Sequence, residues 1–275
     1  MRRISDIYFY CHINTVFVAL VFCMGAEHVL WGRELQIITP VHLLLSGGIL
    51  LVYNLHLALR NIYRKHPIFN ASALPSNQLP HLLFAIIGIF SIMGSFFFLS
   101  NGLKLIFMGG VIVSLAYTLP MLPLGFKKRL RENGTIKILM LSIAWTLIPT
   151  MLPLIEYGTI PIQFIPFLLQ TYLLVFSTCL FFDRRDIADD NKRGLKTFAI
   201  RLGANNSLIL SVALGMSPVV FNLFVNDTGF TGALITSIYA GMAYWLLRNN
   251  FNAKRYLFFV DGIILMYGIT MLTLH

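Results

Sequence analysis

The chain of 275 residues is 57% hydrophobic and only 12% charged, whereas soluble domains average about 25% charged residues. This composition excludes an ordinary soluble domain and indicates an integral membrane protein. Lysine and arginine outnumber the acids by 21 to 11, which gives a net charge of +10. Basic loops are expected where a protein meets anionic lipid headgroups. We therefore expect membrane lipids as partners and no nucleic acid.

Apolar runs long enough to cross about 30 Å of hydrocarbon recur along the chain. No run alternates with the period of a barrel strand, so each one predicts a helix whose backbone groups are paired internally. We expect an all-α, polytopic membrane protein that forms one domain over residues 1–275. The nine predicted spans are 8–31, 40–60, 81–99, 102–122, 136–155, 160–182, 206–226, 230–248 and 256–273.

The distribution of positive charge predicts the orientation of these spans. If the N-terminus is cytoplasmic, the inner segments hold nineteen Lys and Arg residues and the outer segments only Arg33 and Lys104. This bias is typical of multi-pass proteins, whose short cytoplasmic loops are enriched in positive residues. We expect a cell-membrane protein with its N-terminus inside. Glu27 and His28 would then lie hydrated near the outer interface.

Four of the eleven acids lie in one segment, FFDRRDIADDNKRGLKTFAIRLG, at residues 181–203. This acidic cluster consists of Asp183, Asp186, Asp189 and Asp190. Close carboxylates repel one another unless a cation lies among them. One interpretation is a Mg²⁺ site, because Mg²⁺ takes oxygen ligands and is usually shared with a substrate phosphate. The other is a solvated helix surface neutralised by neighbouring arginines and lysines.

The acidic cluster is predicted to continue the helix of residues 160–182 toward the cytoplasm. The first, second and fourth acids are spaced i, i+3, i+7 and therefore share one face. The third, Asp189, points elsewhere and has Arg185 four residues earlier as an expected ion-pair partner. Gly194 fits the position after a helix end, where glycine is favoured.

The same segment resembles the second aspartate-rich motif of the UbiA superfamily of membrane prenyltransferases. That motif reads RD-x-x-x-D-x-x-x-G-x-x-T, followed by an apolar pair and RLG. The residues in register are Arg185, Asp186, Asp190, Gly194, Lys196, Thr197, Arg201, Leu202 and Gly203. Weaker resemblances to bacterial members are Tyr117 and Pro120 before Lys127, Lys128 and Arg129, then Lys137, Trp145, and Asp261 with Gly262.

The resemblance implies a nine-helix bundle around a lipid-open central cavity, in a bacterial inner membrane. An isoprenyl diphosphate would bind there through Mg²⁺ and transfer its prenyl group to a lipophilic aromatic or alcohol acceptor. Asp186 and Asp190 would be the catalytic metal ligands, with Asp183 as a supporting ligand. The implied substrate-binding residues are Asn54, His56, Tyr117, Lys127, Lys128, Arg184 and Arg193.

The chain departs from the first aspartate-rich motif of the family, N-x-x-x-D-x-x-x-D. Asn54 matches, but Ala58 and Ile62 stand at the two aspartate positions, and no acid occurs from residue 35 to residue 131. Three interpretations stay open. Neutral ligands could complete a metal site, basic residues could meet the diphosphate directly, or the protein could bind a lipid without turnover. The neutral candidates are Asn54, His56 and Asn61, and the basic ones are Arg60, Arg64 and Lys65.

The sequence leaves alternative functions open. A non-catalytic isoprenoid- or quinone-binding relative would keep the fold and one acidic segment. A secondary transporter would show repeats and charges deep in the bundle, whereas most charges here fall at one face. His56 could be a packing residue. Asp261, inside the last span, fits either a substrate role or a hydrogen bond to a neighbouring helix.

Overall fold

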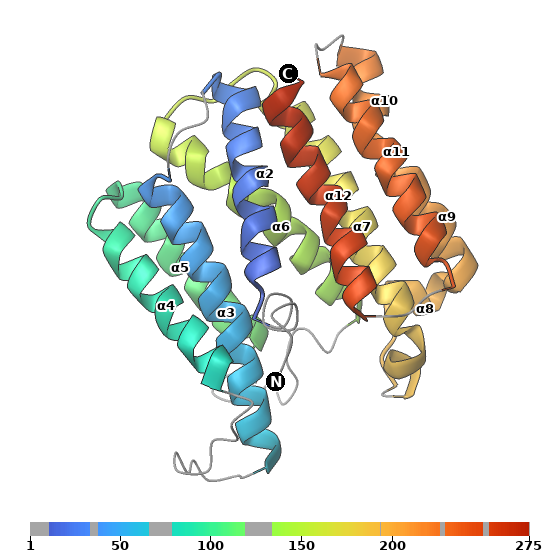
Figure 1. The fold of residues 1–275 in the computed structure, drawn as a ribbon, viewed down its shortest axis with the longest axis horizontal. Coiled ribbons are helices and arrows are strands. Elements are labelled where there is room, and N and C mark those ends of the chain that lie inside the picture. Colours follow the sequence, from blue (N-terminus) through green and yellow to red (C-terminus); the bar gives the residue numbers. More distant parts are fainter. Residues whose placement is uncertain are drawn as a thin grey trace.

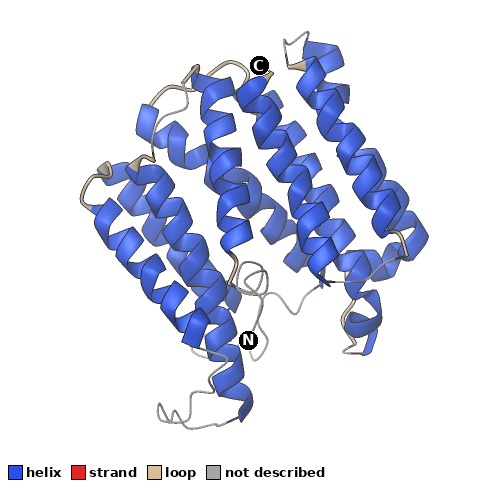
Figure 2. Cartoon of the chain, in the orientation of Figure 1, coloured by secondary structure: helices blue, strands red, loops and turns tan. Residues whose placement is uncertain are grey.

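The computed structural model describes residues 11–33, 38–65, 79–118, 134–192, 194–225, 229–249 and 253–274, and all regular elements in these ranges are helices (Figure 2). The all-α prediction is therefore confirmed for the described residues. The helices are α2 (Ile13–Trp31), α3 (Pro40–Lys65), α4 (Leu79–Phe96), α5 (Asn101–Thr118), α6 (Gly134–Tyr157), α7 (Phe164–Lys192), α8 (Phe198–Leu202), α9 (Ala204–Gly215), α10 (Ser217–Val225), α11 (Phe230–Leu247) and α12 (Ala253–Thr273).

Seven helical segments of the described chain are long and apolar enough to cross a membrane, and α3 adds a shorter apolar stretch. The chain is accordingly a multi-pass membrane protein. The count of nine spans and the orientation stay predictions. The seven segments are Ile13–Trp31, Leu79–Phe96, Gly134–Tyr157, Phe164–Lys192, Ala204–Leu223, Phe230–Leu247 and Arg255–Thr273.

The predicted span 206–226 is interrupted in the structure. Helix α9 ends at Gly215, Met216 forms a turn, and α10 begins at Ser217. Pro218 accounts for the interruption, because proline has no N–H to continue the helical ladder and its ring crowds the preceding turn. The two short helices together form one of the seven apolar segments.

Most helices contact their neighbours along the chain, and α2 also contacts the last helix, α12. Helix α2 contacts α3 and α12, α6 contacts α5 and α7, and α11 contacts α9 and α12. Figure 1 shows α3, α4 and α5 on one side, α9, α10 and α11 on the other, and the remaining long helices between them. This packing places the first turn of α6 beside the last turns of α7.

Two helix pairs approach so closely that they require glycine. A Cβ at Gly88 of α4 would lie 2.7 Å from the carbonyl oxygen of Gly47 in α3. A Cβ at Gly268 of α12 would lie 2.9 Å from the backbone nitrogen of Phe22 in α2. Small residues allow such contacts in membranes, where packing rather than hydrophobic exclusion drives helix association.

Candidate functional site

Helix α7 carries the acidic cluster on its last three turns, as the sequence predicted. The helix continues to Lys192, and Gly194 follows with a φ of +68°, a backbone conformation that favours glycine. The N–H of Leu195 donates to the carbonyl oxygen of Asp190 at 3.0 Å, which closes the helix end. The predicted helical extension and its glycine end are both confirmed.

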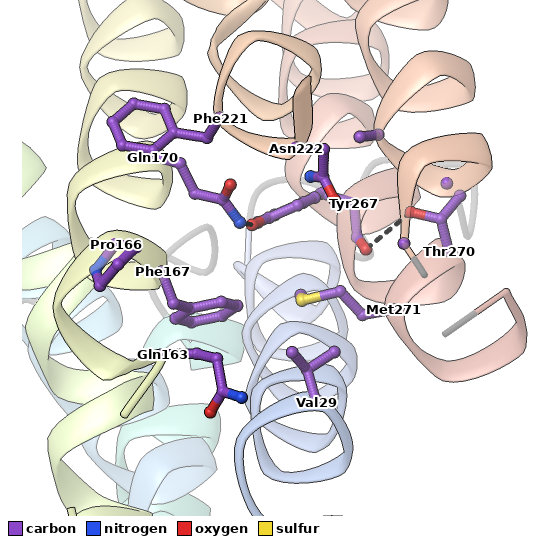
Figure 3. Close-up of a pocket in the computed structure, with 13 residues that line it drawn as sticks. Val29, Gln163, Pro166, Phe167, Gln170, Phe221, Asn222, Tyr267, Thr270 and Met271 are labelled. Carbon is purple, nitrogen blue, oxygen red and sulfur yellow. Dashed lines mark hydrogen bonds between the residues drawn. The ribbon is translucent and has the colours of Figure 1, made fainter. Parts of the chain in front are cut away.

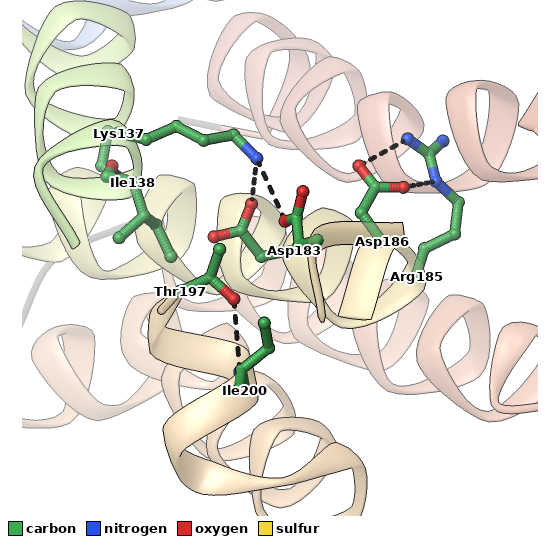
Figure 4. A network of polar contacts seen from close by, with 9 residues as sticks. Lys137, Ile138, Asp183, Arg185, Asp186, Thr197 and Ile200 are labelled. Atoms are coloured by element: carbon green, nitrogen blue, oxygen red, sulfur yellow. Dashed lines mark hydrogen bonds and ion pairs between the residues drawn. The ribbon is translucent and has the colours of Figure 1, made fainter. Parts of the chain in front are cut away.

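The side chain of Lys137, in the first turn of α6, reaches two acids of α7 (Figure 4). Its Nζ lies 2.7 Å from Oδ1 of Asp183 and 4.0 Å from Oδ2 of Asp190. Asp183 is 4% exposed and Asp190 5% exposed, whereas the Lys137 side chain is 27% exposed. A charge-assisted hydrogen bond of this length is among the stronger polar contacts in proteins.

The position of Lys137 depends on a close contact between α6 and the segment before α8. A Cβ at Gly134 would lie 2.5 Å from Cα of Thr197, so only glycine allows α6 to begin here. Thr197 is buried, and its hydroxyl accepts a hydrogen bond from the N–H of Ile200, which caps α8. The glycine and threonine that follow the acids in the motif thus end α7 and position α6.

The remaining acids of the cluster have other partners. Both oxygens of Asp186 accept hydrogen bonds from Arg185, at 2.7 and 3.1 Å. Asp189 lies 3.8 Å from Lys192 in a pair that is mostly exposed. The predicted pair between Arg185 and Asp189 is therefore wrong. An arginine side chain can make a bidentate ion pair with the neighbouring carboxylate, which is stronger than one hydrogen bond across a helical turn.

The acids at Lys137 retain bonding capacity for a further cation. Oδ2 of Asp183 is buried and has no hydrogen-bond partner among the described residues. A buried carboxylate oxygen without a donor is costly unless a cation or donor approaches it. The carboxylate oxygens of the described residues therefore suit one hard divalent ion beside Asp183 and Asp190. Asp186 accepts one hydrogen bond on each oxygen from Arg185, and its remaining lone pairs could add a ligand beside that contact.

The Arg184 side chain, which was predicted to bind phosphate, contacts backbone carbonyl oxygens. It is 6% exposed, and its guanidinium donates to the carbonyl oxygen of Ala204 at 2.9 Å and to that of Arg248 at 2.7 Å. These contacts hold the end of α7 against the start of α9 and the end of α11. They stabilise the frame of the acidic cluster, and the phosphate role of Arg184 stays a prediction.

Asn54, at the first motif, has its side-chain amide engaged in contacts between helices. Nδ2 donates to the carbonyl oxygens of Cys11 and Leu50 at 2.9 and 3.0 Å, and Oδ1 lies 2.9 Å from Nδ1 of His81. Asn54 is fully buried. These bonds join the start of α2 to α3 and α4.

The other predicted substrate-binding residues lie outside the described part. This applies to the side chains of His56 and Tyr117, and to Lys127, Lys128 and Arg193 altogether. Their roles stay predictions. Asp261 of α12 is described, and its Oδ2 accepts a hydrogen bond from Nδ2 of Asn14 in α2 at 3.1 Å. This contact agrees with the interpretation that Asp261 makes a hydrogen bond to a neighbouring helix.

A second titratable group lies at the opposite end of the bundle, where Trp31 of α2 meets Tyr157 of α6. Glu27 is 5% exposed, and its Oε2 lies 3.3 Å from Nε2 of the fully buried His42. The expectation that Glu27 is hydrated is therefore wrong. Sequence position predicted an interfacial residue, but α3 covers it.

The start of α3 favours one tautomer of His42. The backbone N–H of Thr39 donates to Nδ1 of His42 at 3.1 Å. The backbone N–H of His42 in turn donates to the Thr39 hydroxyl at 3.4 Å. This reciprocal arrangement is a capping box with histidine at the third helical position. Since Nδ1 accepts, neutral His42 carries its proton on Nε2, facing Glu27. Cys23 lies close enough to make a three-ligand group, but a protonated Nε2 cannot ligate a metal.

A small pocket is also found at this opposite end, between α2, α7, α10, α11 and α12 (Figure 3). Phe167 and Met271 line it, and within it Nε2 of Gln170 donates to the Tyr267 hydroxyl at 2.7 Å. The pocket lies on the first turns of α7, whereas the acidic cluster lies on its last turns. It is therefore separate from the acidic cluster.

Comparisons with known proteins identify the family. The model of the UbiA prenyltransferase family matches residues 64–268, which is more than half of the chain. The chain belongs to the UbiA prenyltransferase family. No curated protein sequence matches it.

Two solved structures share the fold. One comes from work on digeranylgeranylglyceryl phosphate synthase in membranes. It has a TM-score of 0.59 and is 14% identical to this chain, over 100% of both chains. The other is a UbiA homologue from Archaeoglobus fulgidus, solved with GPP and Mg²⁺. Its TM-score is 0.60 and its identity 15%, over 98% of this chain and 99% of the homologue.

One residue of the site was only partly predicted from the sequence. Lys137 resembled a recurring feature of bacterial UbiA proteins, but its contact with Asp183 was not predicted. The available signal is that Lys137 is the one charged residue in the apolar run 136–155. A charge inside a predicted span usually faces a partner or a cavity.

Proposed function

We propose that this UbiA-family protein is a prenyltransferase that binds an isoprenyl diphosphate at the acidic cluster and transfers the prenyl group to a lipophilic acceptor. The observation that carries the proposal is the buried acid pair beside Lys137, on the segment that matches the family motif. The UbiA homologue bound to GPP and Mg²⁺ supports the substrate class. We further propose one domain of nine spans in the cell membrane, with the acidic cluster cytoplasmic.

The proposed site assigns separate roles to the residues of α7. Asp183, Asp186 and Asp190 would hold Mg²⁺, with Asp186 and Asp190 as the main ligands. The chemistry that Mg²⁺ supplies when bound is neutralisation of the diphosphate charge, which improves diphosphate as a leaving group. Lys137 orients the Asp183 carboxylate, and Arg184 holds the end of α7 in place.

The proposed reaction is a simple exchange at the allylic carbon. The bond from this carbon to the diphosphate oxygen breaks, and diphosphate leaves with the electron pair. The nucleophilic atom of an aromatic or alcohol acceptor forms a bond to the same carbon, and the acceptor loses one proton. The prenyl chain would lie among apolar helices, which also exclude water from the reacting carbon.

A second candidate function is binding of an isoprenoid or a quinone without turnover. Two observations favour it. Residues 35–131 contain no acid, and the Asn54 amide is already bonded to Cys11, Leu50 and His81. The first motif therefore offers little to a metal. Membrane lipids remain expected partners under either function.

Turnover separates these two functions. Purified protein in lipid nanodiscs would receive farnesyl or geranylgeranyl diphosphate with an aromatic or an alcohol acceptor, with and without Mg²⁺. We expect Mg²⁺-dependent diphosphate release that is lost in Asp186→Ala and Asp190→Ala. Tight binding without release on any acceptor would favour the binding protein. Release that persists unchanged in both variants would show that the assigned acids are wrong.

A further inference from the structure

The acidic cluster already contains a cation that belongs to the protein. Lys137 Nζ contacts Asp183 at 2.7 Å and lies 4.0 Å from Asp190. Both carboxylates are nearly buried, at 4% and 5% exposed. An ammonium ion between two carboxylates occupies a position that a shared divalent ion would otherwise take.

The charges of the cluster leave room for only a limited number of further cations. The four acids bring four negative charges, and their contacts with Lys137, Arg185 and Lys192 offset three of them. One negative charge remains, together with the buried Oδ2 of Asp183, which has no hydrogen-bond partner among the described residues. A single divalent ion satisfies both the charge and the orphaned oxygen.

The described residues outside α7 provide no acidic ligand for another ion near the cluster. The sequence from residue 35 to residue 131 holds no Asp or Glu, and Asp261 bonds to Asn14 within the bundle. Hard divalent ions need charged oxygen ligands to compete with their own hydration. A second tightly held ion therefore lacks acidic ligands among the described residues.

We propose that Lys137 is a resident counter-cation of the diphosphate site, so that this protein takes up a prenyl diphosphate with a single divalent ion. The inference rests on the proposed function and specifies its metal requirement. Lys137 acts through Asp183 and Asp190 and is a positioning residue. Because its side chain is 27% exposed, the ammonium can also turn toward the diphosphate.

The test counts metal ions rather than turnover. Mn²⁺ replaces Mg²⁺, and bound Mn²⁺ per chain is measured by electron paramagnetic resonance in nanodiscs with farnesyl thiolodiphosphate, a slowly reacting analogue. We expect one Mn²⁺ per chain in the wild-type protein. In Lys137→Met, which keeps the side-chain length without the charge, we expect a second Mn²⁺. Without the analogue, the variant should bind Mn²⁺ at least about tenfold more tightly, because a positive charge next to the carboxylates is gone.

Two further variants control for charge and for general damage. Lys137→Arg keeps a cation and should bind one Mn²⁺, as the wild type does. Lys192→Met removes a lysine from the exposed pair with Asp189 on the same helix and should leave the count at one.

Three outcomes would overturn the inference. Two or more Mn²⁺ in the wild-type complex would do so without any variant, even if Lys137→Met did not fold. An unchanged count and affinity in Lys137→Met, with the analogue still bound, would overturn this inference alone. No binding of the analogue by the wild-type protein would instead overturn the proposed function, and the inference with it.

Discussion

The bundle holds a buried carboxylate beside a basic side chain at each of its ends, and the two ends differ in the number of carboxylates and in exposure. At the opposite end from the acidic cluster, the single carboxylate of Glu27 lies beside His42, and both are almost fully buried. At the acidic cluster, Lys137 faces both Asp183 and Asp190, and its side chain remains partly exposed.

This difference separates a structural contact from a binding site. The Glu27 and His42 side chains are both enclosed, at 5% and 0% exposed, so a charged ligand has no access to them, and their contact holds α2 against α3. A cluster with surplus acid and a partly exposed cation can accept another cation and, through it, an anion. Changes at the Glu27 end should therefore alter stability, and changes at the acidic cluster should alter ligand binding.

Replacing His42 tests the structural end most strongly. In His42→Leu, the buried Glu27 loses its partner, and breaking a buried pair in this way costs about 3 kcal/mol. Unfolding in detergent, followed by circular dichroism, measures the loss. Binding of a prenyl diphosphate to the folded fraction should not change.

The double variant Glu27→Leu/His42→Leu is the control for this prediction, because removing both partners leaves no unpaired charge. It should recover most of the lost stability. A stable single variant, or one with weaker prenyl diphosphate binding, would show that the Glu27 end is not merely structural.

Gly134→Ala tests the contact that positions Lys137. The added Cβ would lie 2.5 Å from Cα of Thr197, and such overpacking costs about 2 kcal/mol. Since the start of α6 must move, Lys137 should leave Asp183 and the Mn²⁺ affinity should change as well. Gly110→Ala is the matched control, because a Cβ there has nothing within 4 Å. Equal unfolding midpoints for the two variants would contradict the proposed contact.

Asp183→Asn should affect binding more than folding. The loss of one ion pair to a partly exposed lysine costs about 1 kcal/mol of stability. The affinity for a prenyl diphosphate with Mg²⁺ should fall at least about tenfold, as is usual when the support of a metal site is removed. A titration in nanodiscs measures the affinity. A loss of stability as large as that of His42→Leu, with unchanged affinity, would remove the distinction between the two ends.

The exposed pair of Asp189 and Lys192 should have the smallest effect. Both side chains are more than two-thirds exposed, and such surface pairs contribute below about 0.5 kcal/mol. Lys192→Met should therefore unfold at the wild-type temperature in the same detergent. A clear drop in the unfolding temperature would mean that this end of α7 is less solvated than its exposure indicates.

The sequence predicted the helical class, the extension of α7 and its glycine end, because hydrophobic period and helix-end chemistry are local properties. It did not predict the partners of the acids. Arg185 was assigned to Asp189 from helical spacing but meets Asp186, and Lys137 comes from another helix. Glu27 was expected to be hydrated because burial by α3 depends on packing between helices. The ends of a helix can be derived from local spacing, whereas the partners of its charged side chains need the fold.

The most direct test of the proposed site compares two neighbouring acids. Asp190 is 5% exposed beside Lys137, whereas Asp189 is exposed and pairs with Lys192. The measurement is the Mg²⁺-dependent affinity for farnesyl thiolodiphosphate in Asp190→Asn and Asp189→Asn. We expect Asp190→Asn to lose the Mg²⁺-dependent binding and Asp189→Asn to bind like the wild type. Equal affinities in the two variants would contradict a diphosphate site at the acidic cluster.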